Sequence, residues 1–317
     1  MKKILVTRKL IKDSEDYATN IFNAKLNKDD TLLTSEELIS KSKDCEGILS
    51  SLTEKIDSKV ISKLSDSVKI ISNFAVGFGN IDIIAAKKKN IIVTNTPDVL
   101  TDATAEIAML ILLGAARRAN EGLKLVRKKN WKWSADFLMG KQLTGARLGI
   151  LGMGRIGRAI AHRARSFGMI IHYHNRTQLD KSLEKGAIYH SNLESLLRVS
   201  DFFSINCPAT DKTKHIINRE TLKYFPDGSI ISNSARGDMI DDEAMVEALK
   251  SGKIFSIGLD VYNGEPNIHP DYLNLQNVFV LPHLGSSTIK TRTAMGNLAV
   301  SNLEEFFKTG KCKNAIN

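Results

Sequence analysis

The amino-acid sequence predicts an α/β protein with two doubly wound, mostly parallel sheets. Short β-branched or apolar runs alternate with helical patterns along the chain, which is typical of βαβ units. The length of 317 residues, with 42% hydrophobic and 25% charged residues, fits about two globular domains. A long apolar helical pattern from Thr101 to about Lys128 separates the first four predicted strands from the others. Two sheets are therefore favoured over one.

Ten runs are predicted as strands because each is short, apolar or β-branched, and separated from the next by a helical pattern or turn residues. They are Ile4 to Thr7, Gly47 to Ser50, Val68 to Asn73, Ile91 to Thr94, Arg147 to Leu151, Ile170 to His174, Phe202 to Cys207, Ser229 to Ser232, Ser256 to Val261 and Val278 to Leu281. A last helical pattern, Ser286 to Lys308, follows the final strand, and we expect it to return to the first domain.

The domain boundaries are expected in tight connections, because the chain has no Gly/Ser linker and no low-complexity tract. The two connections are Thr96-Pro97-Asp98 and Ser286-Ser287. Residues 1–98 and 288–317 then form one domain, and residues 99–287 form the other. A cleft between two such domains is the expected place for a ligand, and its closure would exclude water from a reaction.

Composition argues against secretion, membrane insertion and a disulfide framework. The apolar run near the amino terminus, Ile4 to Val6, is shorter than the roughly 7 to 15 residues of a signal peptide. The longest uncharged apolar stretch, Ile107 to Ala116, is shorter than the roughly 20 residues that span a bilayer. The three cysteines are odd in number and widely separated, which argues against both disulfides and a zinc site. We expect a soluble cytoplasmic protein without a metal or a membrane partner.

The formal charge of +10 raises the question of nucleic-acid binding. The basic clusters, such as Lys87-Lys88-Lys89 and Arg127-Lys128-Lys129, are short and are not interleaved with the stacking aromatics of single-strand binders. A lysine-rich solvated surface explains the charge better, so no nucleic-acid partner is expected.

A glycine pattern after the fifth predicted strand indicates a dinucleotide site. Gly152, Gly154 and Gly157 form a Gly-x-Gly-x-x-Gly turn between the strand Leu148 to Leu151 and an amphipathic helix from Arg155 to Phe167. Such glycines permit a tight turn and close approach of the backbone to a pyrophosphate at the helix N-terminus. The alternative is a chance glycine turn, which the strand and helix context disfavours.

The end of the next strand bears on which dinucleotide is bound. Asn175, Arg176 and Thr177 stand where an NAD-specific site places an acid on the ribose 2′-hydroxyl. A neutral Asn175 leaves room for a 2′-phosphate, and Arg176 can pair with it. NADP(H) is therefore the preferred cofactor, with NAD(H) possible. The alternative is that Asn175 and Arg176 are ordinary residues of a surface turn.

Three charged residues, which we call the trio, indicate the chemistry. They are Arg236, Glu265 and His283, within Ala235-Arg236-Gly237, Gly264-Glu265-Pro266 and Leu281-Pro282-His283-Leu284-Gly285. A planar guanidinium suits the carboxylate of a 2-oxo acid, a protonated imidazole can give a proton to its carbonyl oxygen, and an adjacent carboxylate favours the charged imidazole. Taken separately, each could be a solvated arginine, a loop glutamate or a packed histidine.

The order of these motifs resembles the D-isomer-specific 2-hydroxyacid dehydrogenase family over nearly the whole chain. The matching segments also include residues 73–82, Asn95 to Asp102, Ser234 to Gly237, and Gly258 to Tyr262. Within that family, residues 96–102 and the Asn175-Arg176-Thr177 segment at the end of the predicted strand look most like glyoxylate and hydroxypyruvate reductases. The resemblance implies two Rossmann/flavodoxin-like domains with the active site in the cleft between them, the first binding the substrate and the second the dinucleotide.

The resemblance also implies roles for further residues. Those implied to contact substrate are Leu52, Val76, Gly77, Arg236, His283 and Ser286. Those implied to contact cofactor are Thr104, Gly152, Gly154, Arg155, Ile156, Gly157, Asn175, Arg176, Thr177, Cys207, Pro208, Thr213, Ser234, Ala235, Arg236, Asp260, His283 and Gly285. Asp260 is expected near the nicotinamide amide. Cys207 replaces the family's usual apolar residue, so we interpret it as a packing residue.

The sequence thus predicts an NADPH-dependent reductase of a small 2-oxo acid, converting glyoxylate to glycolate or hydroxypyruvate to D-glycerate. Another D-2-hydroxyacid dehydrogenase, such as a 2-ketogluconate reductase, is an alternative with the same trio. A nucleotide-sensing corepressor is an alternative of a different class, because fold alone does not fix function. A homodimer is expected from the resemblance. The long helix predicted from Thr101 and the segment Trp131-Lys132-Trp133 are expected at the contact between the subunits.

Overall fold

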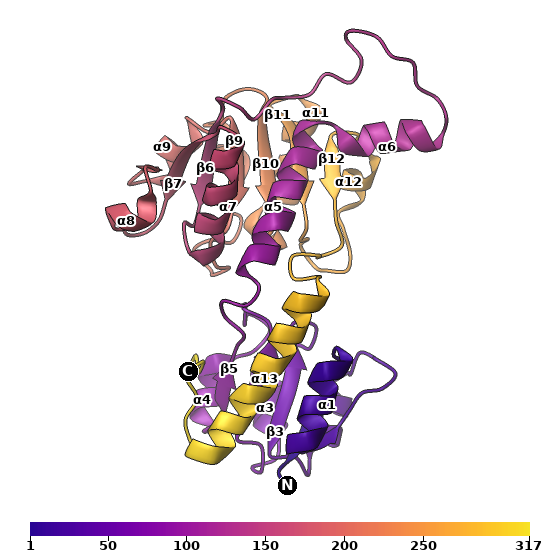
Figure 1. Ribbon diagram of the computed structural model, residues 1–317, viewed down its shortest axis with the longest axis vertical. Helices are drawn as coiled ribbons and strands as arrows, with labels where there is room; N and C mark the ends of the chain where they lie inside the picture. The colour runs from indigo at the N-terminus through magenta and orange to yellow at the C-terminus, as the bar shows by residue number, and fades with distance from the viewer. The chain divides into compact units, whose positions relative to one another are not determined.

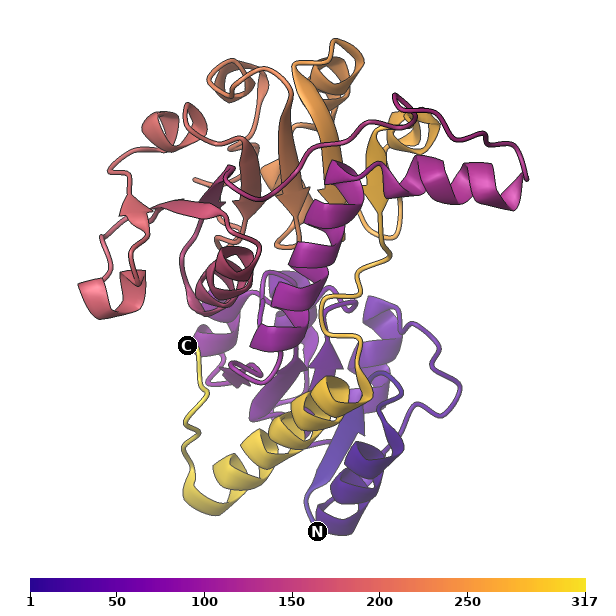
Figure 2. The same cartoon turned by 45° about the horizontal axis from the view of Figure 1, so that its top comes forward.

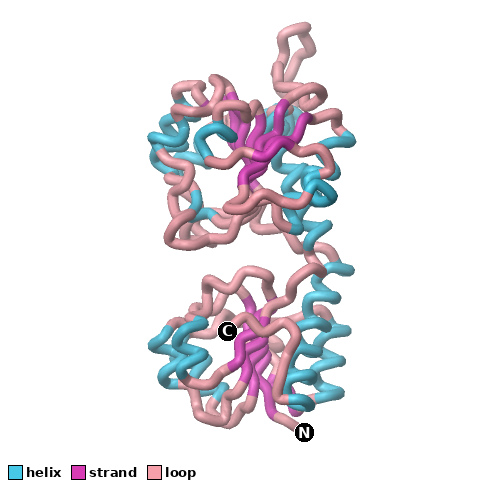
Figure 3. Tube along the Cα trace, turned by 90° about the vertical axis from the view of Figure 1, so that its left-hand side faces the viewer, coloured by secondary structure: helices cyan, strands magenta, loops and turns pink.

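The computed structural model describes residues 1–317 as two compact units (Figure 1). The first unit contains Met1–Leu100 and Ser287–Asn317, and the second contains Thr101–Ser286. Each unit has one parallel sheet with helices on both faces, as the tube trace shows (Figure 3). This confirms the predicted α/β class with two parallel sheets.

The first unit contains a five-stranded sheet of order β2-β1-β3-β4-β5, the flavodoxin-like arrangement. Its strands are β1 (Lys3–Val6), β2 (Asn23–Lys25), β3 (Gly47–Ser51), β4 (Ile70–Phe74) and β5 (Ile92–Thr94). Its helices are α1 (Lys12–Ile21), α2 (Ser35–Ser42), α3 (Ser58–Lys63), α4 (Ile83–Lys88) and α13 (Ile289–Thr309). The three-residue strand β2 gave no apolar pattern and was not predicted.

The C-terminal helix α13 packs with α1 on one face of this sheet (Figure 2). Ala299, Val300 and Leu303 of α13 are fully buried against strand residues such as Ile4 and Ile70. The Ser72 hydroxyl also donates to the carbonyl oxygen of Ala299 at 2.9 Å. The opposite face is covered by α2, α3 and α4. The helix α13 is therefore part of the first unit's core.

The second unit contains a seven-stranded sheet of order β12-β11-β10-β9-β6-β7-β8. Its strands are β6 (Arg147–Leu151), β7 (Ile170–His174), β8 (Ile188–Tyr189), β9 (Phe202–Ile205), β10 (Ser229–Asn233), β11 (Ile254–Leu259) and β12 (Val278–Val280). Its helices are α5 (Thr101–Ala116), α6 (Ala119–Arg127), α7 (Arg155–Ser166), α8 (Lys181–Glu184), α9 (Leu193–Leu197), α10 (Arg219–Leu222), α11 (Asp242–Lys250) and α12 (Pro270–Asn274), with a 3-10 turn, η1 (Gly237–Met239). The two-residue edge strand β8 was not predicted either.

The long helix predicted from Thr101 to about Lys128 is in fact two helices, α5 and α6. The chain breaks at Arg118, whose φ of 52° is left-handed and interrupts the helical hydrogen-bond ladder. The Arg118 side chain then pairs with Glu121 of α6, with Nε and Nη2 donating at 2.8 and 2.7 Å. The prediction of a single helix was wrong because neither glycine nor proline marks this break.

The strand order of the second unit reverses between β6 and β9. In open parallel sheets, ligands bind at the carboxyl ends of strands at such a switch point. Apart from Thr104, which lies on α5, the segments predicted to bind cofactor or to carry the trio follow the carboxyl ends of β6, β7, β9, β10, β11 and β12. All of them therefore lie along one edge of this sheet.

Candidate active site

The glycine turn after β6 has the shape of a phosphate cradle. Gly152 has a φ of 94°, and a Cβ there would stand 2.5 Å from the backbone nitrogen of Cys207. A Cβ at Gly157 would stand 2.2 Å from the carbonyl oxygen of Gly152. Gly154, in contrast, faces open space and begins α7 without a side-chain cap, and Arg155 and Ile156 form the first turn. The uncapped helix N-terminus suits a pyrophosphate.

The turn after β7 contains no acidic side chain. Asn175 accepts a hydrogen bond from the backbone N–H of Met153 at 2.7 Å, so its amide helps to hold the glycine turn. Arg176 and Thr177 are exposed. A guanidinium is thus available beside the turn, and no carboxylate stands at the end of the strand.

The polar side chains that follow β9 and β10 differ in whether they find a hydrogen-bond partner. The Cys207 thiol lies 3.9 Å from the Met239 sulfur, and burial raises its pKa to about 11, so the thiol is protonated near neutral pH. The Thr213 hydroxyl donates to the carbonyl oxygen of Pro208 at 2.8 Å. The Ser234 hydroxyl is buried without a hydrogen-bond partner. Such an orphaned polar group fits a position that contacts a bound cofactor.

Arg236 follows β10 in a loop that is held by Asn233. The Asn233 side chain donates to the carbonyl oxygen of Arg236 at 2.7 Å and accepts from the Ala235 N–H at 3.0 Å. Burial lowers the pKa of the Arg236 guanidinium, and the charges of Glu265 and Asp238 oppose this shift. An arginine stays charged near neutral pH even so. A partly buried cation with this loop support can bind a carboxylate.

Glu265 and His283 lie in direct contact. The His283 Nδ1 is 2.6 Å from the Glu265 Oε2, and the two side chains are 29% and 28% exposed. Burial would raise the pKa of Glu265, but the hydrogen bond and charge of His283, the Tyr262 N–H and Arg236 together lower it. The carboxylate is therefore ionised and accepts from Nδ1–H, which leaves Nε2 for other partners. This is the arrangement of an oriented acid–base histidine.

Asp260 fixes the chain beyond His283. Its two carboxylate oxygens accept from the N–H groups of Leu284 and Gly285 at 2.7 and 2.8 Å. Burial raises the pKa of Asp260, and the Leu284 hydrogen bond opposes this shift. The residue predicted near the nicotinamide amide thus also organises the loop of His283. The Thr104 hydroxyl would lie 3.6 Å from a Cβ at Gly285, so Thr104 borders the same loop, which ends at Ser286.

Leu52, Val76 and Gly77 belong to the first unit, where they follow β3 and β4. Leu52 is 40% exposed. The Asn80 amide nitrogen donates to the carbonyl oxygens of Ser51 and Glu54 at 2.9 and 3.0 Å, which ties the Leu52 loop to the segment after β4. Asn80 was not among the predicted site residues.

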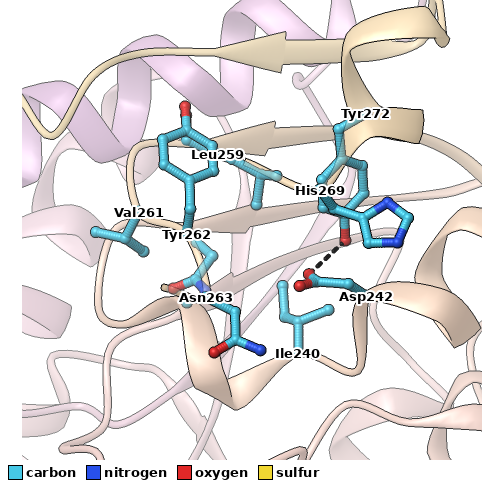
Figure 4. Close-up of a pocket in the computed structure, with 10 residues that line it drawn as sticks. Ile240, Asp242, Leu259, Val261, Tyr262, Asn263, His269 and Tyr272 are labelled. Atoms are coloured by element: carbon cyan, nitrogen blue, oxygen red, sulfur yellow. Dashed lines mark hydrogen bonds between the residues drawn. The ribbon is translucent and has the colours of Figure 1, made fainter. Parts of the chain in front are cut away.

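A small, tightly filled pocket lies beside the loop that follows β11 (Figure 4). It is lined by Asp242, Tyr262, Asn263, His269 and Tyr272, among others. The Tyr272 hydroxyl donates to Asp242 at 3.0 Å, and burial raises the pKa of Asp242. Of these residues, Tyr262 also reaches the trio, since its N–H donates to Glu265 Oε1 at 2.9 Å. The spacing Tyr262-x-x-Glu265 was the one signal in the sequence for this bond.

The fold and this edge of the second sheet define a nicotinamide-dependent oxidoreductase, and comparisons with known proteins identify the family. The family profile described as "D-isomer specific 2-hydroxyacid dehydrogenase, NAD binding domain" matches residues 109–285. A glycerate dehydrogenase of Hyphomicrobium methylovorum is 41% identical over 309 residues, 96% of each chain.

Solved structures agree with this assignment. A glyoxylate reductase from Paecilomyes thermophila is 35% identical with a TM-score of 0.90, covering 99% of this chain and 98% of that one. An NADPH-dependent glyoxylate/hydroxypyruvate reductase from Sinorhizobium meliloti, in complex with NADP and malonate, is 32% identical with a TM-score of 0.89, covering 99% and 96%. The chain belongs to the D-isomer-specific 2-hydroxyacid dehydrogenase family. It is an oxidoreductase that binds a nicotinamide cofactor and acts on 2-oxo or 2-hydroxy acids.

No helix of the structure is both long enough and apolar enough to cross a bilayer.

Proposed function

We propose that this protein reduces a small 2-oxo acid with NADPH, converting glyoxylate to glycolate and hydroxypyruvate to D-glycerate. The observation that carries the proposal is the 2.6 Å contact between Glu265 and His283 Nδ1, because it orients a histidine whose other nitrogen can act as a proton donor. In this proposal residues 99–287 bind the dinucleotide, and residues 1–98 with 288–317 contribute contacts to substrate.

The proposed chemistry transfers one hydride and one proton to the carbonyl group. When bound, the reduced nicotinamide supplies the hydride to C2 of the 2-oxo acid. His283 donates its Nε2 proton to the carbonyl oxygen, so that the product is a hydroxyl group rather than an alkoxide. Glu265 stabilises the imidazolium before the transfer and keeps Nδ1–H in place afterwards. His283 then takes a proton from solvent to restore the starting state.

Substrate binding is proposed to depend on the carboxylate that all 2-oxo acids share. Arg236 pairs with it through two parallel N–H donors, which fixes the plane of the substrate. Backbone N–H groups at Val76 and Gly77 provide further donors, and glycine permits the close approach that such a contact needs. Leu52 forms an apolar wall, and Ser286 borders the substrate.

The proposed preference for NADPH rests on Asn175, Arg176 and Thr177. An acidic side chain at the end of β7 would repel a 2′-phosphate, and none is present there. Arg176 is exposed and can pair with the phosphate. The relative from Sinorhizobium meliloti, which was solved with NADP, is described as NADPH-dependent. The glycine turn, Ser234 and Cys207-Pro208 would hold the remainder of the dinucleotide.

Initial rates with a panel of substrates and both cofactors test this function. Glyoxylate, hydroxypyruvate, pyruvate and 2-ketogluconate are each supplied with NADPH and with NADH. We expect the highest kcat/KM for glyoxylate or hydroxypyruvate with NADPH. A clear preference for 2-ketogluconate would favour the alternative reductase. NADPH binding without oxidation by any of the four acids would favour a nucleotide-sensing protein.

A homodimer is proposed as the functional assembly. The segment from α6 to Met139 exposes large apolar side chains that one chain alone leaves in water: Leu123, Val126, Trp131, Trp133 and Met139. Exposed apolar residues gathered on one segment favour a protein contact. Light scattering after size exclusion should give about twice the mass of the chain, and Trp133→Ser should shift the equilibrium toward the monomer.

A further inference from the structure

Tyr262, just after β11, makes hydrogen bonds both to Glu265 and to the loop that leads to His283. Its backbone N–H donates to Glu265 Oε1 at 2.9 Å. Its hydroxyl donates to the carbonyl oxygen of Leu281 at 2.6 Å, two residues before His283, with a longer contact of 3.4 Å to the Leu259 carbonyl oxygen. One residue thus touches the loop of the carboxylate and the loop of the imidazole.

The Leu281 carbonyl is the acceptor that shapes the turn at His283. The His283 N–H also donates to this oxygen, at 3.1 Å, so the carbonyl receives two donors. His283 has a φ of 54°, in the left-handed region that a β-carbon disfavours. Such a conformation persists only where neighbouring contacts impose it. The Tyr262 hydroxyl fixes the carbonyl before His283, and Asp260 fixes the two N–H groups after it.

The loop of Arg236 is fitted against the same residue. A Cβ at Gly237, the residue after Arg236, would stand 1.9 Å from the backbone carbonyl carbon of Tyr262. The two loops therefore meet through backbone atoms with no space between them. Tyr262 consequently adjoins the segments of all three members of the trio.

We propose that Tyr262 is a positioning residue that holds the Glu265–His283 pair in register through its hydroxyl bond to Leu281 and its N–H bond to Glu265. The inference rests on the proposed function, since it assigns Tyr262 to the same proton-donor site. Without the hydroxyl, the Leu281 carbonyl loses a donor, and the His283 turn can relax toward ordinary backbone angles. The Nε2 proton is then less often directed at the substrate.

A tyrosine that only fills space would be the simpler explanation, and Tyr272 provides the comparison. Tyr272 lines the same pocket, is 3% exposed and also has a hydroxyl hydrogen bond, to Asp242 at 3.0 Å. Figure 4 shows the Tyr262 hydroxyl directed away from the Asp242–Tyr272 pair. Removal of either hydroxyl deletes a partly buried hydrogen bond, but only the Tyr262 hydroxyl binds the loop of a trio residue.

The test compares Tyr262→Phe with the matched control Tyr272→Phe. Steady-state kinetics with glyoxylate and fluorescence titration with NADPH give kcat, KM and the cofactor Kd. The Nδ1–H proton resonance of His283 in protein with 15N-labelled histidine reports the contact with Glu265 without any substrate, and Glu265→Gln serves as the reference for a disrupted pair.

For Tyr262→Phe we expect kcat to fall about three- to tenfold with NADPH affinity unchanged, because one hydrogen bond that orients the acid is lost. The His283 resonance should move toward that of Glu265→Gln. Tyr272→Phe should keep both kcat and the resonance of the parent. The inference is overturned if the resonance stays at the parent position in Tyr262→Phe, or if Tyr272→Phe has the same effects. An inactive parent would refute the proposed function instead, and the resonance would still decide this inference.

Discussion

The carboxyl edges of the two sheets use the same architecture for different chemistry. In the second unit, the loops after β10, β11 and β12 carry a guanidinium, a carboxylate and an imidazole, and a glycine turn follows β6. In the first unit, the loops after β3 and β4 carry no such cluster, and amide side chains such as Asn80 join them. Parallel α/β sheets thus supply the place for a site, and the loop residues decide its chemistry.

This difference predicts that substitutions in the two units affect different kinetic parameters. If the second unit provides the acid and the cofactor site, changes there should alter kcat or cofactor affinity. If the first unit provides neutral contacts to substrate, changes there should alter KM.

The largest effect is expected for His283→Ala. Loss of the proton donor should lower kcat by about 10²- to 10⁴-fold, the usual contribution of general acid catalysis. NADPH affinity should change little, because the imidazole acts on the carbonyl oxygen. Steady-state rates and a fluorescence titration measure the two quantities. The control is His162→Ala, which removes an exposed histidine of α7. Lost cofactor affinity with an unchanged chemical step would contradict the role as acid.

A smaller effect, confined to one cofactor, is expected for Arg176→Ala. The charge-assisted pairing with a 2′-phosphate should be lost, so kcat/KM for NADPH should fall about 10- to 100-fold while that for NADH changes little. Arg219→Ala removes another exposed arginine, paired with Glu247, and controls for the change in net charge. Equal losses with NADPH and NADH would refute the assignment of Arg176 to the 2′-phosphate.

In the first unit, Asn80→Ala should raise KM for the 2-oxo acid about three- to tenfold. The variant loses two hydrogen bonds that join the Leu52 loop to the segment after β4, and it leaves the second unit's residues unchanged. Asn277→Ala is the matched control, because its amide also donates to two carbonyl oxygens, those of Leu249 and Phe255. A fall in kcat at constant KM would contradict the proposal that the first unit contributes only contacts to substrate.

The smallest effect is a pH-dependent change in stability for Asp242→Asn. Burial raises the pKa of Asp242, so the folded protein holds this proton more tightly than the unfolded chain does. The native protein therefore loses stability as the pH rises through the raised pKa, and that loss is absent at acid pH below the unfolded value. The variant should gain stability relative to the parent at pH 8 and less at pH 4.5, measured by urea unfolding. A difference in unfolding free energy between variant and parent that does not change with pH would exclude Asp242 as the titrating group.

Much of the fold could be predicted from the sequence because periodicity and the glycine pattern are local signals. The strand before Gly152 and the helix after it follow from residues that are neighbours in the chain. The break at Arg118 could not be predicted, since it depends on an ion pair with Glu121 and a left-handed residue that is neither glycine nor asparagine. The edge strands β2 and β8 are too short to show a pattern.

The trio could be named from residue types and order, but the hydrogen bonds that support its loops could not, even where the residue itself, such as Asp260, was among those named. These hydrogen bonds join side chains to backbone groups of loops. Two of them, from Asp260 and Tyr262, reach a loop about 20 residues further along the chain, and that of Asn233 closes its own loop. Such contacts depend on where loops meet at the sheet edge, and single-sequence patterns do not encode that geometry. The left-handed conformation of His283 could not be predicted either, because no glycine marks the position.

The proposed cofactor preference depends on one atom of Asn175, the amide nitrogen that an aspartate would replace by a charged oxygen. Its Oδ1 already accepts the Met153 N–H at 2.7 Å, and an aspartate has the same shape and would keep that bond. Replacing the amide NH₂ by a carboxylate oxygen would leave the glycine turn intact and add a charge that repels a 2′-phosphate and can bind a ribose hydroxyl. Under the proposed assignment, Asn175→Asp should invert the ratio of kcat/KM for NADPH to that for NADH, and an unchanged ratio would show that the selectivity lies elsewhere. Coenzyme choice in this protein would then be adjustable by mutation without cost to the architecture that binds the dinucleotide.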